Sequence, residues 1–125
     1  MSEIVFTPNV PASNPLLSQT HIVNGLVFTS GQTAADPAAG TMPEGIEAQA
    51  EQCIQNLRAV LEAAGSDLAH VIKTTCFLAS PEDAGAFNRV YGKYFLGKPA
   101  RSCIAVRFPN GKLLCEIEAV AEQIK

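Results

Sequence analysis

Residues 46–79, IEAQAEQCIQNLRAVLEAAGSDLAHVIKTTCFLA, decide the fold, because the spacing of apolar residues changes within them. From Ile46 to Ala64, apolar side chains recur every three or four residues, which is the spacing of one face of an α-helix. Gly65 stands where a glycine commonly ends a helix. The β-branched and aromatic residues of Val71–Ala79 then predict a strand. This order predicts a domain in which helices pack on a sheet.

Further strands and a second helix flank this stretch. Upstream, Asn24-Gly25 separates two apolar runs, which is the strongest short-range signal of a hairpin. Downstream, Ser80-Pro81 begins a second helix, with Ser at the N-cap and Pro at the first helical position. Two last strands are expected near residues 101–107 and 113–121. The sequence thus predicts a single domain over residues 1–125, with an α+β fold, a mixed sheet of five or six strands, and two helices on one face.

Two helices can cover only one face of such a sheet, yet its strands are apolar on both faces. The hairpin strands around Asn24-Gly25 have apolar residues on either side. In the strand at 71–79, alternation assigns one face to Ile72, Cys76 and Leu78, and the other to Val71, Phe77 and Ala79. An apolar face left open on a small domain is typically a partner's surface. We therefore expect a homo-oligomer that packs sheet against sheet.

Composition narrows the class of protein. The chain has 125 residues, of which 47% are hydrophobic and 17% charged, and this excludes an intrinsically disordered protein. Its net charge is −3, and its nine Lys and Arg residues are scattered, whereas nucleic-acid-binding domains usually carry a basic stripe. No apolar run has the roughly 18 residues of a membrane-spanning helix, and the first residues do not resemble a secretory signal. We expect a cytoplasmic protein that binds neither nucleic acid nor membrane.

The cysteines do not predict a metal site or a disulfide framework. Cys53, Cys76, Cys103 and Cys115 form no C-x-x-C pair and have no H-x₃₋₅-H nearby, so structural zinc has no support from spacing. Each lies in an apolar periodic segment, where cysteine behaves as a small hydrophobic residue. We expect reduced, mostly buried thiols.

The last two strands hold the charged residues that could carry chemistry. Glu116 and Glu118 alternate with apolar residues and therefore share one face. Either they are exposed acids on a solvated edge strand, or they face the partner, one as a base and the other in an ion pair. Arg101 begins the strand before them. Its planar guanidinium could bind a small carboxylate, or it could form a structural salt bridge with one of the two glutamates.

Five segments resemble, in this order, those of one known family. They are Phe28-Thr29-Ser30-Gly31-Gln32, Val71-Ile72-Lys73-Thr74-Thr75, Phe87-Asn88-Arg89-Val90-Tyr91, Pro99-Ala100-Arg101-Ser102-Cys103 and Cys115-Glu116-Ile117-Glu118-Ala119-Val120-Ala121. The family is that of the reactive intermediate/imine deaminases, named Rid or YjgF and formerly endoribonuclease L-PSP. The resemblance runs from about Ser13 to Ala121, and P-A-R-S combined with E-I-E-A is its most specific part.

The resemblance implies a chorismate-mutase-like α+β fold that assembles as a homotrimer, with a site in each cleft between subunits. Family members hydrolyse enamine and imine intermediates, such as 2-aminoacrylate, to 2-keto acids and ammonia, as in 2-iminobutanoate/2-iminopropanoate deaminases. No metal or organic cofactor is implied. Carried over by motif, Arg101 would bind the substrate carboxylate with help from the Cys103 amide, and Glu116 would activate the attacking water. The pocket would also be lined by Ser30, Gly31 and Asn88.

Two departures from the family pattern concern the pocket wall. The segment Asn14–Gln19 has leucines, Leu16 and Leu17, where the family commonly has an aromatic residue, and it is longer by one residue. The link Phe95–Pro99 is shorter than in many members, which would open the rim beside Arg101. Both bear on substrate preference. The alternative functions are an RNA-cleaving or translation-inhibiting protein, as some relatives have been labelled, and a trimer that binds a small ligand without turnover.

Overall fold

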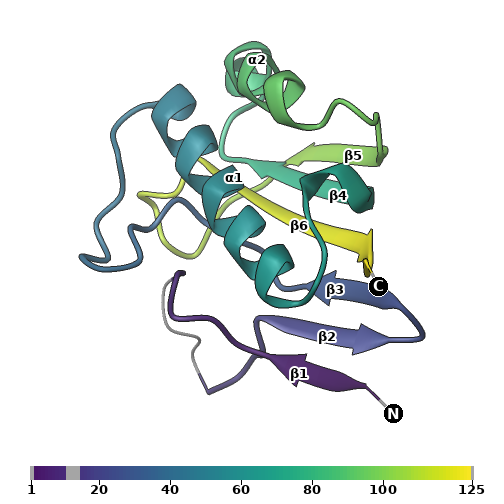
Figure 1. Cartoon of the computed structure of the whole chain (residues 1–125). Coiled ribbons are helices and arrows are strands. Elements are labelled where there is room, and N and C mark those ends of the chain that lie inside the picture. Colours follow the sequence, from purple (N-terminus) through teal and green to yellow (C-terminus); the bar gives the residue numbers. More distant parts are fainter. Residues whose placement is uncertain (1, 11–14, 125) are drawn as a thin grey trace.

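The computed structural model describes residues 2–10 and 15–124, and its main elements are six strands and two α-helices (Figure 1). The strands are β1 (Glu3–Val5), β2 (Thr20–Val23), β3 (Leu26–Thr29), β4 (Val71–Leu78), β5 (Ala100–Ala105) and β6 (Cys115–Glu122). The helices are α1 (Ile46–Ala63) and α2 (Ala84–Tyr94), with short 3₁₀ turns at η1 (Leu68–His70) and η2 (Pro81–Asp83). Neither α-helix in this described part is long and apolar enough to cross a membrane.

The six strands form one mixed sheet in the order β1-β2-β3-β6-β4-β5. Only β4 and β5 pair in parallel, because α2 connects them, and the other neighbours are antiparallel. Both helices lie on the same face of the sheet (Figure 1). The expected α+β fold with two helices on one face of a mixed sheet is confirmed, with the strand count at the upper of the two values expected.

The hairpin and the first helix lie where the sequence predicts them. β2 and β3 are joined by Asn24 and Gly25, whose φ angles of 51° and 77° are those that a two-residue hairpin turn requires. The helix α1 ends one residue before the expected Ala64, and Gly65 follows it with φ 81°. Ser80 accepts a hydrogen bond from the Glu82 amide, but the turn it caps is 3₁₀, so α2 begins only at Ala84.

The core lies between the helices and the covered face of the sheet. The apolar stripe of α1 is buried against alternating residues of β6, as period-two alternation of that strand requires. The side chains at the centre are 0% exposed and come from α1 (Ala50, Cys53, Leu57), β3 (Val27), β4 (Cys76) and β6 (Cys115, Ile117, Ala121). Three of the four cysteines are therefore buried, whereas Cys103 on β5 is exposed, and the four are free thiols.

The assignment of the first residues of β4 to the two faces of the sheet is wrong. A β-bulge between Val71 and Lys73 inserts one extra residue, which exchanges the sides of the two residues before Lys73. Val71 is thus only 7% exposed and joins Cys76 and Leu78 in the core, while Ile72 is 42% exposed on the open face. Large apolar side chains remain on the uncovered side of the sheet, as expected for a surface that a partner covers.

Candidate active site

Arg101 lies at the beginning of β5 and its side chain packs under α2. Its Nη2 donates a 2.7 Å hydrogen bond to Oδ1 of Asn88, one of the residues expected to line the pocket. The guanidinium carbon lies 4.3 Å from the centre of the Tyr91 ring and 5.8 Å from that of Phe87. Thr74 of β4 is the register partner of Arg101, so the side chain is on the face of the sheet that the helices cover.

The charge of Arg101 has no anionic partner in the part of the chain that the structure describes. The ion pairs there join other residues, and Nε of Arg101 is buried with no hydrogen-bond partner. The nearby Cys76 thiol does not supply a negative charge, because burial raises its pKa more than Arg101 lowers it. Of the two interpretations of Arg101, a salt bridge with Glu116 or Glu118 is therefore wrong for the single chain. A partly buried cation in this state is suited to an anionic ligand.

Cys103 follows Arg101 by two residues on the same strand and so lies on the same side of β5. It pairs in register with the buried Cys76 of β4, but β5 is the edge strand and leaves Cys103 exposed. Arg101, Asn88 and Cys103 thus form one cluster at the α2 edge of the sheet, which we call the arginine cluster.

Glu116 belongs to a second cluster on the open face of the sheet. The segment that follows β3 lies beside it: a Cβ atom on Gly31 would be 1.9 Å from Oε2 of Glu116, so only glycine permits this approach. Ser30 precedes Gly31 and donates a 2.5 Å hydrogen bond from Oγ to the Ser18 carbonyl. Backbone hydrogen bonds of 2.8 and 3.0 Å then tie Gln32 to Ile117. We call Ser30, Gly31 and Glu116 the glutamate cluster.

The environment of Glu116 differs from that of an exposed acid. Burial raises the pKa of its carboxyl group above the ordinary value, and the like charge of Glu118 raises it further. The strand β6 lies between β3 and β4, so the first of the two alternatives, a solvated edge strand, is wrong, although Glu118 itself is exposed. A carboxylate with a raised pKa is better matched to proton transfer near neutral pH than an ordinary one.

Two polar residues of α1 and the Cys53 thiol bind the backbone around the glutamate cluster, and sequence reasoning missed this role. The buried Gln49 accepts a hydrogen bond from the Leu114 amide, just before β6. Asn56 is also buried and donates to the carbonyls of Thr33 and Ala35 at 2.8 and 2.9 Å. Between them on the same helix face, the Cys53 thiol donates to the Gln32 carbonyl. The available signal was the pair of polar residues Gln49 and Asn56, seven positions apart on one helix face and beside the apolar stripe.

The two clusters do not meet within one chain. Thr74 pairs with Arg101 and Phe77 pairs with Glu116, so the two charged residues point to opposite faces of the sheet. Two strand spacings and three residue rises separate them, which places their Cα atoms about 14 Å apart. The structure therefore brings together Arg101, Asn88 and Cys103, and separately Ser30, Gly31 and Glu116, as two half-sites.

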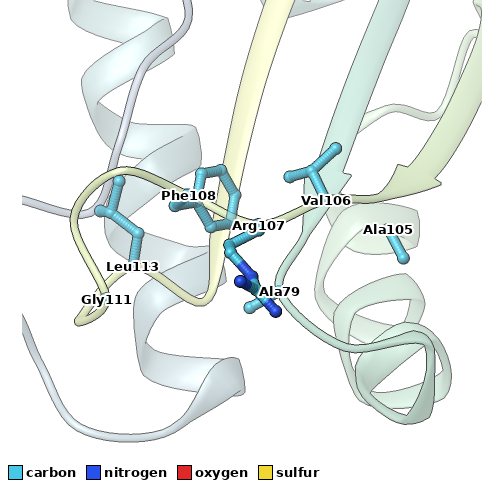
Figure 2. A pocket seen from close by; sticks show the side chains of 7 residues that line it. All are labelled: Ala79, Ala105, Val106, Arg107, Phe108, Gly111 and Leu113. Carbon is cyan, nitrogen blue, oxygen red and sulfur yellow. The ribbon is translucent and has the colours of Figure 1, made fainter.

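The described surface also has cavities, and they lie elsewhere. One of about 460 Å³ is at the far end of β4 and β5 from Arg101, with Arg107 and Phe108 among its lining residues (Figure 2). Another, of about 640 Å³, lies between the loop before α1 and the loop before β6. None of the residues expected at the site lines either cavity. Within residues 2–10 and 15–124, no group of three or more His, Cys, Asp or Glu side chains is placed to hold a metal ion.

The fold and the two half-sites define a small α+β protein with an arginine suited to an anion and a carboxylate suited to proton transfer. Comparison with known proteins identifies its family. A sequence model described as Endoribonuclease L-PSP matches residues 7–123. The chain is 39% identical over 124 residues to the 2-iminobutanoate/2-iminopropanoate deaminase of Rattus norvegicus, covering 97% of this chain and 90% of that protein.

Two further relatives support the same family. A RutC family protein of Synechocystis is 43% identical over 123 residues, covering 95% of each chain. The crystal structure of E. coli TdcF with bound serine is similar with a TM-score of 0.91 and 32% identity, covering 98% of this chain and 99% of that one. The chain therefore belongs to the L-PSP family, also known as the Rid or YjgF family.

The approach of Gly31 to Glu116 generates a prediction about the carboxyl group. We expect Gly31→Ala to turn the Glu116 side chain toward solvent, because the added Cβ would overlap Oε2. The pKa of Glu116 should then fall toward its ordinary value, since burial is the main cause of its rise. Carbon-detected NMR titration of the glutamate carboxyl groups measures this. Gly85→Ala is the matched control, because a Cβ there has no neighbour within 4 Å; an unchanged Glu116 pKa in Gly31→Ala contradicts the prediction.

Proposed function

We propose that this protein is an imine deaminase that hydrolyses small 2-imino acids, and their enamine tautomers such as 2-aminoacrylate, to 2-keto acids and ammonia. The observation that carries the proposal is the half-buried Arg101, which has no anionic partner in the described chain and which has the fork geometry that fits a carboxylate. The family membership and the deaminase named among the relatives support the same chemistry.

In the proposed binding step, the substrate carboxylate occupies the outer edge of the Arg101 guanidinium. Asn88 accepts a 2.7 Å hydrogen bond from one nitrogen of the guanidinium and thereby limits the rotation of the guanidinium. The exposed strand at Cys103 offers a backbone amide beside the same edge. Two parallel hydrogen bonds fix both the position of the carboxylate and the direction of the adjacent imine carbon.

In the proposed chemical step, Glu116 removes a proton from a water molecule as the water oxygen attacks the imine carbon. With the imine nitrogen protonated, this attack gives a neutral carbinolamine whose nitrogen is an amine. Glu116 then returns the proton to that nitrogen, which leaves as ammonia while the hydroxyl group gives its proton back to Glu116 and the carbon–oxygen double bond forms. One positioned base and a held carboxylate are enough, because an imine is intrinsically reactive toward water.

Both half-sites must face one another for this reaction, and we propose that they do so between subunits of a homotrimer. Within one chain, Arg101 and Glu116 lie on opposite faces of the sheet, so a second copy has to complete each site. The open face is apolar enough for such packing, with Phe28, Ile72 and Ile104 between 42% and 47% exposed. The number three comes from the family resemblance, and the trimer is proposed to act in the cytoplasm.

The wall of the proposed site differs from the family pattern at residue 17. The Ser18 carbonyl accepts a hydrogen bond from Ser30 of the glutamate cluster, and Leu17, the residue before Ser18, is 44% exposed. An aliphatic rather than aromatic side chain is therefore presented near this half-site. Asn14, at the beginning of the departing segment, lies outside the described residues.

Arginine and glutamate substitutions test the proposed function. With 2-aminoacrylate generated in situ by a serine dehydratase, the wild type should release ammonia faster than spontaneous hydrolysis. Arg101→Ala should lose about 10²-fold or more in rate through misplacement of the substrate. Arg101→Lys should recover little, because an ammonium lacks the planar fork. Glu116→Gln should keep ligand binding and lose roughly 10²–10⁴-fold in turnover.

The outcomes separate the proposal from its alternatives. Near-wild-type ammonia release by Arg101→Ala would overturn the role of that residue. A trimer that binds a keto acid but never accelerates hydrolysis is the non-catalytic ligand-binding alternative. If the wild type and Glu116→Gln both cleave RNA and neither hydrolyses imines, the protein is the RNA-cleaving alternative. The net charge of −3 argues against that alternative.

The raised pKa of Glu116 generates a prediction about pH. Only the ionised form can accept a proton, so kcat/KM should fall as pH decreases through this raised pKa. Replacing Glu118 by Gln removes the like charge that contributes to the rise, so the acid limb of the profile should move to lower pH. A pH series of kcat/KM at constant ionic strength, corrected for spontaneous hydrolysis, measures the acid limb in the wild type and in Glu118→Gln. An acid limb that stays in place in Glu118→Gln contradicts the assignment of Glu116 as the base.

The open face generates a prediction about assembly. Light scattering of the wild type should give about three times the 13.2 kDa of one chain. Phe28→Asp places a charge on the open face, where Phe28 is 42% exposed, and should dissociate the trimer and abolish turnover because a buried unpaired carboxylate is unfavourable. Ala63→Asp is the control, because it adds the same charge at an exposed position of α1, on the opposite side of the sheet. A stable, active monomer would refute the trimer and the shared site together.

A further inference from the structure

We infer that Tyr91 is a positioning residue for the substrate: its ring is the platform that holds the Arg101 guanidinium with its outer edge turned toward the carboxylate. This inference rests on the proposed function, because it assigns Arg101 the role of carboxylate anchor. It adds a residue that does not touch the reacting atoms and acts through Arg101.

The contact between the two side chains is close. The Arg101 guanidinium carbon is 4.3 Å from the centre of the Tyr91 ring, whereas Phe87, the other ring nearby, is 5.8 Å away. A guanidinium over an aromatic face is attracted by the ring quadrupole, more so where water is excluded. Tyr91 is 8% exposed, so one face of the cation is shielded from water.

Arg101 needs such a platform because its strand gives it little support. The strand β5 is at the edge of the sheet, and its other residues are exposed. The Arg101 side chain has several rotatable bonds. In the described chain it donates one hydrogen bond to an oxygen acceptor, Oδ1 of the exposed Asn88. A single hydrogen bond fixes one nitrogen and leaves the plane of the fork free to turn, whereas a ring beneath it fixes that plane.

Tyr91 is itself held in place from two sides. Its hydroxyl shares a 2.8 Å hydrogen bond with Oγ1 of Thr74, which is fully buried. Its ring stacks on that of Phe95 with the two centres 4.3 Å apart. Thr74 is also the register partner of Arg101, so the ring is anchored to the residue directly beside the one it supports.

This arrangement separates the two parts of the Tyr91 side chain. The hydroxyl is engaged with Thr74, and burial raises its pKa, so it stays protonated and is not a base. The ring face is what contacts Arg101. Removing the hydroxyl should therefore matter little to substrate binding, whereas removing the ring should let the guanidinium turn and weaken binding without altering the Glu116 step.

The test compares Tyr91→Phe, Tyr91→Leu and Val90→Ala in the assembled protein. Two quantities are measured: the dissociation constant of 2-oxobutanoate by NMR titration, and KM and kcat for imine hydrolysis. In Tyr91→Leu, we expect the dissociation constant and KM to rise about tenfold, in the range of a desolvated cation–π contact, with kcat nearly unchanged. Tyr91→Phe should stay within about threefold of wild type, because it keeps the ring.

Val90→Ala is the matched control, because Val90 is buried in the same helix at 4% exposure and its loss costs stability. Its KM should remain that of the wild type. In addition, Tyr91→Leu should have no further effect on 2-oxobutanoate binding once Arg101→Ala is present, since the ring acts through that residue.

Wild-type binding by Tyr91→Leu, or equal weakening in Val90→Ala, would overturn the inference and leave Tyr91 as a core residue only. A wild type that binds 2-oxobutanoate through Arg101 but does not hydrolyse imines would refute the proposed function, while the binding data would still decide the role of Tyr91. A wild type that does not bind 2-oxobutanoate would overturn both.

Discussion

The structure depends on the strict alternation of β6 in the middle of the sheet. Because successive side chains of a strand point to opposite faces, Cys115, Ile117 and Ala119 enter the core under α1 while Glu116 and Glu118 emerge on the other side. The same backbone therefore carries the apolar contacts that hold the helices and the carboxylate of the candidate site. A shift of one residue in this strand would bury both acids and expose the core.

The division of the candidate site follows from that constraint. Arg101 is on the helix side of an edge strand, and Glu116 is on the open side of a central one. Each half-site is supported by its own helix: the ring of Tyr91 on α2 lies beneath the arginine, and the amides of Gln49 and Asn56 on α1 hold the backbone around the glutamate. A chain built in this way can preform both halves and still depend on a neighbour to join them.

Much of the fold could be predicted from the sequence because its signals are local. The Asn24-Gly25 turn and the stripe of α1 depend on a few neighbouring residues, and both were confirmed. The exchange of Val71 and Ile72 could not be predicted, because a bulge is set by the pairing of β4 with β6. For the site, the charged residues were visible in the motifs, but the ring beneath Arg101 and the approach of Gly31 to Glu116 arise only when distant segments meet.

The place of β6 in the sheet also has a consequence for how the chain folds. It is the last strand in the sequence, yet it lies between β3 and β4, which have no pairing with each other. The sheet is therefore two separate pieces, the β1-β2-β3 meander and the β4-α2-β5 unit, until residues 115–122 join them. Contacts over such sequence separations slow folding, and they leave strand edges open on the way. In a ribosome-bound chain that stops short of β6, α1 could still contact β3 and α2, but the strand whose side chains fill the centre of the core would be missing.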